Sequence, residues 1–230
     1  VEELVEQKKM FEIFREFSHW NRILNVTNIS DLNNAAHNGE AERLIKVSEA
    51  LHEKKMAQIA DLISGKREDV RLVLISGPSS SGKTTFSKRL AVQLLVNGIK
   101  PLNLSLDNYF VDRDKTPLDE DGNYDFEALG ALDVELFNEH LLALMKGEEV
   151  SLPRFSFETG KRYYNGEKLK MSKDNILIVE GIHGLNPQLT HLIESKAKYK
   201  IYVSALTNIN IDDQTRIPTP CHRLRPGRER

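Results

Sequence analysis

The sequence contains very little cysteine and no long hydrophobic run. Its single cysteine, Cys221, cannot form an internal disulfide and has no second cysteine with which to bind a metal. The longest aliphatic runs, 72–75 and 176–179, have four residues each, whereas a membrane-spanning helix needs about 20 apolar residues. The acidic first residues also lack the basic start and apolar core of an export signal. We therefore expect a cytoplasmic protein without membrane contact.

The sequence also lacks an excess of charge of either sign. It has 32 Lys and Arg against 34 Asp and Glu, which gives a formal net charge of −2 at pH 7. A nearly neutral chain has no global positive field with which to bind nucleic acid non-specifically. With 40% hydrophobic and 29% charged residues, the composition is that of a globular protein. We expect no direct nucleic-acid binding, and any anion site must be local.

The hydrophobic pattern changes at residues 65 and 66. Residues 1–65 show helical spacing of apolar residues and predict a helical appendage, in which Ser30 or Asp31 caps a short helix. In residues 66–230, helical patterns alternate with short apolar runs that predict strands, at 70–76, 101–106, 176–179 and 199–203. The two helices predicted between these strands cover 86–95 and 134–145. This alternation predicts an α/β fold, a doubly wound parallel sheet with helices on both faces.

A glycine-rich motif follows the first predicted strand and opens a helix. Residues 77–84 match GxxxxGK[ST], the phosphate-binding loop of P-loop NTPases. The glycines let backbone N–H groups approach phosphate oxygens, Lys83 brings a positive charge, and the Thr84 hydroxyl is a candidate Mg²⁺ ligand. The sequence predicts binding of ATP, with GTP left open, and Mg²⁺. The nucleotide-binding residues are Gly77, Ser79, Ser80, Ser81, Gly82, Lys83, Thr84 and Thr85.

Two carboxylates lie where other predicted strands end. Asp107 follows the second strand and could accept the proton of an attacking hydroxyl, although a turn or helix cap is the alternative. Glu180 follows a buried strand, where a carboxylate is costly unless it is paired or bound to a metal. We expect Asp107 and Lys83 to be catalytic, and Thr84 and Glu180 to hold Mg²⁺.

Five separated motifs together resemble the P-loop uridine kinase and phosphoribulokinase family. In chain order they are 77–84, 106–110, 124–126, 153–157 followed by Arg162, and 179–182. The resemblance implies that residues 66–230 form a P-loop kinase domain. It also implies transfer of the γ-phosphoryl of ATP to the 5′-hydroxyl of a nucleoside, with Asp107 as the base.

The resemblance extends to the acceptor site. It implies that Asp125 binds ribose hydroxyls and that an aromatic hairpin covers the base. His183 lies just after Glu180 and is a further candidate for this pocket. Turn formation by Asp125, core packing by the aromatic residues and a structural role for His183 are the alternatives. The expected substrate-binding residues are Tyr109, Asp125, Phe155, Phe157, Arg162 and His183.

The match looks closest to a longer branch of the family, whose kinase domain follows a region similar to threonyl-tRNA synthetase. Residues 11–20, 50–56 and 203–207 resemble that branch, which would make 1–65 a connector after a missing front region. The same resemblance implies a lid that this chain does not complete, in which guanidinium groups would neutralise charge on the transferred phosphoryl. Its expected residues are Arg216, Arg223 and Arg225. Oligomeric short relatives imply a homo-oligomer.

Departures from the family pattern leave the acceptor open. Gly160 occupies the position at which short uridine kinases carry the histidine that reads a pyrimidine. Directly after Arg225, Pro226 and Gly227 oppose a continuous lid helix. Two alternatives therefore stand beside a nucleoside kinase. One is a kinase of another small hydroxyl metabolite, such as a sugar phosphate or pantothenate. The other is a non-catalytic, nucleotide-binding regulatory module.

Overall fold

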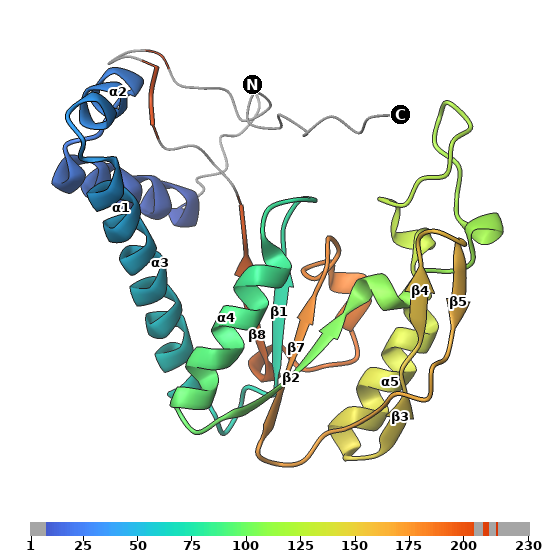
Figure 1. The fold of residues 1–230 in the computed structure, drawn as a ribbon. Helices are drawn as coiled ribbons and strands as arrows, with labels where there is room; N and C mark the ends of the chain where they lie inside the picture. The colour runs from blue at the N-terminus through green and yellow to red at the C-terminus, as the bar shows by residue number, and fades with distance from the viewer. Residues whose placement is uncertain (1–7, 205–208, 212–214, 216–230) are drawn as a thin grey trace, which may run out of the picture. The chain divides into compact units, whose positions relative to one another are not determined.

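The computed structural model describes residues 8–204, 209–211 and 215 (Figure 1). Its helices are α1 (Lys8–Leu24), α2 (Ile29–His37), α3 (Ala41–Ser64), α4 (Lys83–Val96) and α5 (Val134–Lys146). Its strands are β1 (Leu72–Ser76), β2 (Lys100–Ser105), β3 (Glu149–Ser151), β4 (Arg154–Ser156), β5 (Lys161–Tyr163), β6 (Lys168–Lys170), β7 (Asn175–Glu180) and β8 (Lys198–Tyr202). Short 3-10 helices include η1 (Leu106–Tyr109) and η2 (Arg113–Lys115).

The four strands predicted from the sequence form one parallel sheet. Its order is β2-β7-β1-β8, so every neighbour is reached by a crossover connection. In this register Glu180 of β7 lies opposite both Ile75 of β1 and Ser105 of β2. The carboxyl ends of these strands therefore meet at one edge of the sheet, with the loop that enters α4 (Figure 1).

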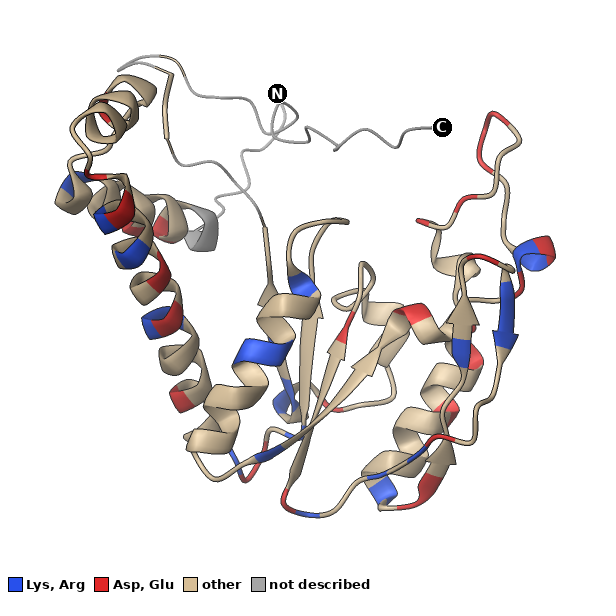
Figure 2. Ribbon diagram, viewed as in Figure 1, with Lys and Arg blue, Asp and Glu red and all other residues tan. Residues whose placement is uncertain are grey.

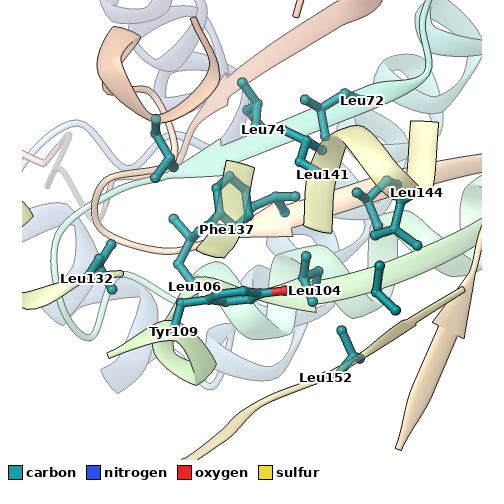
Figure 3. Packing of buried hydrophobic residues seen from close by; sticks show 14 of the residues in the cluster. Leu72, Leu74, Leu104, Leu106, Tyr109, Leu132, Phe137, Leu141, Leu144 and Leu152 are labelled. Atoms are coloured by element: carbon teal, nitrogen blue, oxygen red, sulfur yellow. The ribbon is translucent and has the colours of Figure 1, made fainter. Parts of the chain in front are cut away.

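Helices cover both faces of this sheet, because alternate residues of each strand point to opposite sides. Leu72 and Leu74 of β1 pack with Phe137, Leu141 and Leu144 of α5 on one face (Figure 3). On the other face, Val73 and Ile75 cluster with residues of α4 and the end of α3. The structure thus confirms the predicted α/β fold with helices on both faces.

Helix α5 begins and ends where the sequence predicts. Asp133 is its N-cap and accepts a hydrogen bond from the Leu136 amide at 3.0 Å. Gly147 ends the helix in the left-handed conformation, with a φ of 83° that a side chain would strain. Two antiparallel strand pairs, β3 with β6 and β4 with β5, follow α5.

The described residues divide into two compact units, one up to Glu53 with 209–211 and 215, and one from Lys54 to Ser204. The predicted domain boundary at residues 65 and 66 stays a prediction. In the first unit, the cap of α2 is Asn28, where the sequence suggested Ser30 or Asp31. Asp31 instead occupies the third helical position, and its carboxylate accepts a bond from the Asn28 amide. Asn28 is the cap because its side chain and that of Asp31 each accept a hydrogen bond from the other residue's backbone amide, which is a capping box.

Among the helices in the described part of the chain, none is both long enough and apolar enough to span a membrane.

Phe137 is the residue whose truncation should cost most in this core. It is 1% exposed and packs edge-to-face on Tyr109, with ring centroids 5.2 Å apart. We expect Phe137→Ala to lower the free energy of unfolding by about 3–5 kcal/mol, because it opens a cavity between α5 and the sheet. Chemical denaturation measures this. Val92→Ala, at a site 57% exposed on α4, should lower the free energy of unfolding by less than about 0.5 kcal/mol. Equal losses of stability in the two variants would contradict the assignment of Phe137 to the core.

Candidate active site

The loop between β1 and α4 has the conformation of an anion cradle. Ser80 and Gly82 both adopt left-handed backbone angles, with φ of 60° and 86°. The Lys83 ammonium donates to the Pro78 carbonyl oxygen at 2.9 Å, across the loop. The Ser81 hydroxyl oxygen is buried and has no hydrogen-bond partner among the described atoms. Since buried polar atoms are nearly always paired, this one is available to a bound ligand.

Gly77 allows the loop to pass against the end of β8. A Cβ at this position would lie 2.0 Å from the Val203 carbonyl oxygen and 2.9 Å from the Ser81 hydroxyl. Val203 is itself held there, since its amide donates to the Ser76 carbonyl oxygen at 2.7 Å. Only glycine permits this approach of two backbones.

Asp107, Glu180 and Lys83 share one electrostatic environment at the carboxyl edge of the sheet. Asp107 lies in η1, directly after β2, and Glu180 ends β7 and is 8% exposed. Asp107 is open to solvent, yet partial desolvation by the surrounding protein raises the pKa of its carboxyl. The charge of Glu180 raises that pKa further, and Lys83 opposes both effects. The structure therefore brings the predicted base, metal ligand and phosphate-binding lysine together.

The turn after β7 packs against the end of β1 and carries His183. The Ser76 hydroxyl donates to the Ile182 carbonyl oxygen at 2.7 Å, and the Gly181 amide donates to the Ile75 carbonyl oxygen at 3.1 Å. These bonds bring His183 to the edge of the sheet where Glu180 ends β7. Its Nε2 is buried and has no hydrogen-bond partner in the described part of the chain.

Aromatic rings from three segments form a cluster beyond Asp107. Phe155 and Phe157 have ring centroids 5.1 Å apart, and both contact the ring of Phe110, at 5.5 and 5.6 Å. Phe126 joins them at 5.9 Å from Phe110. Phe157 remains 56% exposed, so the cluster offers a ring surface to a ligand.

Three of the predicted substrate-binding residues have hydrogen-bond partners within the protein. Tyr109 is completely buried, which raises the pKa of its hydroxyl, and this hydroxyl lies 3.0 Å from Nδ1 of His140. One carboxylate oxygen of Asp125 accepts from two amides of its own turn, at 2.9 and 3.1 Å. Arg162 is paired with Asp133 at 2.8 Å. Tyr109 therefore lies in the core and Asp125 takes part in a turn, and the substrate-binding role of these residues stays a prediction.

The sequence did not reveal a pocket of about 540 Å³ beside Arg162. No motif marked it, because its walls come from three separate segments that only the fold brings together. Charged and apolar side chains line it in mixture: Val111, Asp112, Lys115, Leu132, Asp133, Val134, Glu135 and Arg162. The predicted lid residues Arg216, Arg223 and Arg225, and also Cys221, lie outside the described residues.

The residues at the loop suit a magnesium ion that is held partly by phosphate oxygens. Within the described ranges, no group of three His, Cys, Asp or Glu side chains could form a metal site by itself. Mg²⁺ is commonly bound by one or two protein oxygens, with substrate phosphates and water completing its shell. The exposed Thr84 hydroxyl and the Glu180 carboxylate supply oxygen ligands of that kind.

Comparison with known proteins places the chain in a family. The model of the "Phosphoribulokinase / Uridine kinase family" matches residues 72–216. A uridine kinase of Halobacterium salinarum is 25% identical over 137 residues, covering 60% of this chain and 57% of the relative. Uridine-cytidine kinase C of Dictyostelium discoideum is 29% identical over 154 residues, covering 67% of this chain and 31% of the relative. Inorganic pyrophosphatase TTM2 of Arabidopsis thaliana is 32% identical over 133 residues, covering 58% of this chain and 18% of the relative.

The chain thus spans little more than half the length of the first of these curated relatives, and less of the other two. The family match begins at Leu72, where the parallel sheet begins, and includes the phosphate loop, Asp107 and Glu180. Because this match covers most of the sequence, the chain belongs to the phosphoribulokinase and uridine kinase family.

Proposed function

We propose that this protein is an ATP-dependent kinase that phosphorylates the 5′-hydroxyl of a nucleoside. The observation that carries the proposal is the position of Asp107, which directly follows β2 at the sheet edge where Glu180 ends the neighbouring strand β7 and the phosphate loop enters α4. A carboxylate placed beside a phosphate cradle serves a reaction that removes a proton from an attacking hydroxyl. Binding of a nucleotide alone would not need it.

Each residue of the edge has a role in this reaction. The loop amides at the start of α4 and the Lys83 ammonium hold the phosphates of ATP. Asp107 orients the acceptor hydroxyl and takes its proton, while the hydroxyl oxygen bonds to the γ-phosphorus and the bond to the ADP oxygen breaks. Thr84 and Glu180 would hold Mg²⁺, which when bound supplies positive charge against the phosphate oxygens.

The aromatic cluster supports a nucleoside as the acceptor. Phe110 is three residues beyond Asp107 in the chain, and its ring contacts both Phe155 and Phe157. The exposed ring of Phe157 offers a surface on which a flat nucleobase could stack. Two of the curated relatives are named as uridine or uridine-cytidine kinases. The particular base is left to experiment.

A kinase of another hydroxyl metabolite is the second candidate. Asp125 uses one carboxylate oxygen within its own turn and is therefore only partly available to ribose hydroxyls. A relative named as an inorganic pyrophosphatase also shows that the names in this group extend beyond nucleoside kinases. The resemblance of the N-terminal region to threonyl-tRNA synthetase, a homo-oligomeric state and a cytoplasmic location remain predictions.

ADP release from Mg²⁺-ATP with a panel of nucleosides and sugar phosphates tests the proposal. We expect release to depend on one nucleoside class and to fall at least about 100-fold in Lys83→Met, because the charge at the phosphates is lost. Lys88→Met, at an exposed lysine of the same helix, should retain full activity.

Other outcomes of this assay would reject a nucleoside kinase. Dependence on sugar phosphates or pantothenate would establish the second candidate. ATP binding without release for any acceptor would instead support a regulatory nucleotide-binding module.

A further inference from the structure

The β4–β5 hairpin is bonded to the segment that follows Asp107, and Arg162 lies at the centre of this contact. Its guanidinium donates to the carbonyl oxygen of Phe110 at 3.1 and 3.2 Å and to that of Tyr109 at 3.4 Å. The same group donates to Oδ2 of Asp133 at 2.8 Å. The Arg162 side chain is only 19% exposed, so water competes little for these bonds.

Further bonds join the hairpin to the same segment. The Arg162 amide donates to Oδ1 of Asp112 at 2.9 Å, and the Arg113 amide donates to the Gly160 carbonyl oxygen at 2.9 Å. The Arg113 guanidinium donates to the Phe157 carbonyl oxygen at 2.6 Å. A Cβ on Gly160 would lie 2.8 Å from Nε of Arg113. Figure 2 shows the basic strand β5 with acidic segments around it. The hairpin and residues 109–113 are thus tightly packed.

Asp133 connects this contact to the core of the domain. Its Oδ1 caps α5 by accepting from the Leu136 amide, and its Oδ2 accepts from Arg162. Burial raises the pKa of Asp133, but the Leu136 amide and the Arg162 guanidinium outweigh it, and that pKa lies below its ordinary value. Through Phe137, α5 packs on the sheet. Arg162 therefore ties the end of η1 to a helix that cannot easily move.

From these contacts we infer that Arg162 is a positioning residue for Asp107. Asp107 lies in η1, and the two carbonyl groups that Arg162 holds belong to the last residue of η1 and the next one. With those carbonyls held, the turn that carries the Asp107 carboxylate has one orientation toward the acceptor hydroxyl. The donors of Arg162 are directed to protein oxygens, which distinguishes this role from the substrate contact expected from the sequence. The inference rests on the proposed function.

Lysine cannot replace arginine in this arrangement. The planar guanidinium reaches two carbonyl oxygens and one carboxylate oxygen at once, whereas an ammonium is a single point of charge on a flexible stem. Arg162→Lys therefore keeps the charge and removes the geometry. A matched control is Arg154→Lys, since Arg154 lies on β4 of the same hairpin and its Nε donates to Glu167 at 3.0 Å rather than to a carbonyl oxygen of residues 109 and 110.

A double-mutant cycle tests whether Arg162 acts through Asp107. We expect Arg162→Lys to lower kcat by about 10–100-fold, with little change in the KM for ATP. In an Asp107→Asn background the same change should lower kcat less than about 3-fold, because the group being positioned is absent. Arg154→Lys should change kcat less than about 2-fold in both backgrounds. An equal loss in both backgrounds from Arg162→Lys would overturn the inference.

Amide hydrogen exchange tests the same inference without activity. Arg162→Lys should increase the exchange rate of amides in 106–112 at least about 10-fold, and Arg154→Lys should leave it unchanged. If Arg162→Lys does not fold, Asp133→Asn retains an N-cap and removes the charged partner, and it should show the same change to a smaller degree. Unchanged amide exchange in 106–112 for both variants would overturn the inference. Increased exchange in a protein without acceptor-dependent turnover would reject the proposed kinase activity and leave the ordering of η1 by Arg162 standing.

Discussion

Asp107→Asn should lower acceptor phosphorylation by about 100–10,000-fold, the range that a positioned general base contributes. Asparagine has nearly the same shape, so the acceptor and ATP should still bind, but it cannot take the hydroxyl proton. Steady-state kinetics with the acceptor found in the panel would show the loss in kcat. Asp121→Asn, at an exposed loop position, should have normal kinetics. Full turnover by Asp107→Asn would remove Asp107 from the mechanism.

The same substitution should stabilise the protein when nucleotide and Mg²⁺ are absent. Because the folded-state pKa of Asp107 is raised, the folded protein binds this proton more strongly than the unfolded chain. Stability from this group is therefore present at low pH and is lost as pH rises through the folded pKa. At neutral pH the ionised carboxylate opposes folding, and Asn removes that opposition. Thermal unfolding at pH 7 should show a higher Tm for Asp107→Asn, and the difference should shrink in acid.

Gly77→Ala is the second substitution for which we expect a large effect. The new Cβ would lie 2.0 Å from the Val203 carbonyl oxygen, so one of the two backbones must shift. We expect the loop to be displaced, with a loss of about 3 kcal/mol in the free energy of unfolding. ATP affinity should fall at least about 10-fold, because the loop amides no longer converge on the phosphates. Denaturation and titration with a fluorescent ATP analogue measure the two effects.

Gly98→Ala is the matched control for this close approach. Gly98 follows α4 with a φ of 74°, and a Cβ there would meet nothing within 4 Å. Its substitution should therefore cost only the strain of the left-handed conformation, about 1 kcal/mol, and leave ATP affinity unchanged. Equal ATP affinity in the two variants would show that the approach of Gly77 to Val203 does not shape the loop.

Local patterns in the sequence predicted most of the sheet and its helices. The strand predicted at 70–76 is β1 at Leu72–Ser76, and the helix predicted at 134–145 is α5 at Val134–Lys146. The physical reason is that apolar runs, caps and glycine stops act on neighbouring residues. The cap of α2 was misplaced because several polar residues compete there, and the reciprocal bonds between Asn28 and Asp31 decide among them.

The part of the candidate site that lies at the carboxyl edge of the sheet could be predicted, because parallel topology determines it. Residues that follow parallel strands meet at one edge of the sheet, so strand order along the chain was enough to group the phosphate loop, Asp107 and Glu180. The aromatic hairpin was expected from a resemblance and from the alternation of Phe155 and Phe157 through Ser156. The rings of Phe155 and Phe157 do pack together, but nothing in the hairpin's own sequence indicates that Phe110 joins them.

The α/β fold, the phosphate loop and the carboxylates at the edge of the sheet follow from local sequence, because each depends on neighbouring residues or on strand direction. The contacts of Tyr109 and Arg162 follow only from the three-dimensional packing. Arg162 bonds to Asp133 and Phe110, which are 29 and 52 residues away in the chain. Such contacts depend on how the hairpin packs against η1 and α5, and no periodicity or spacing encodes that packing.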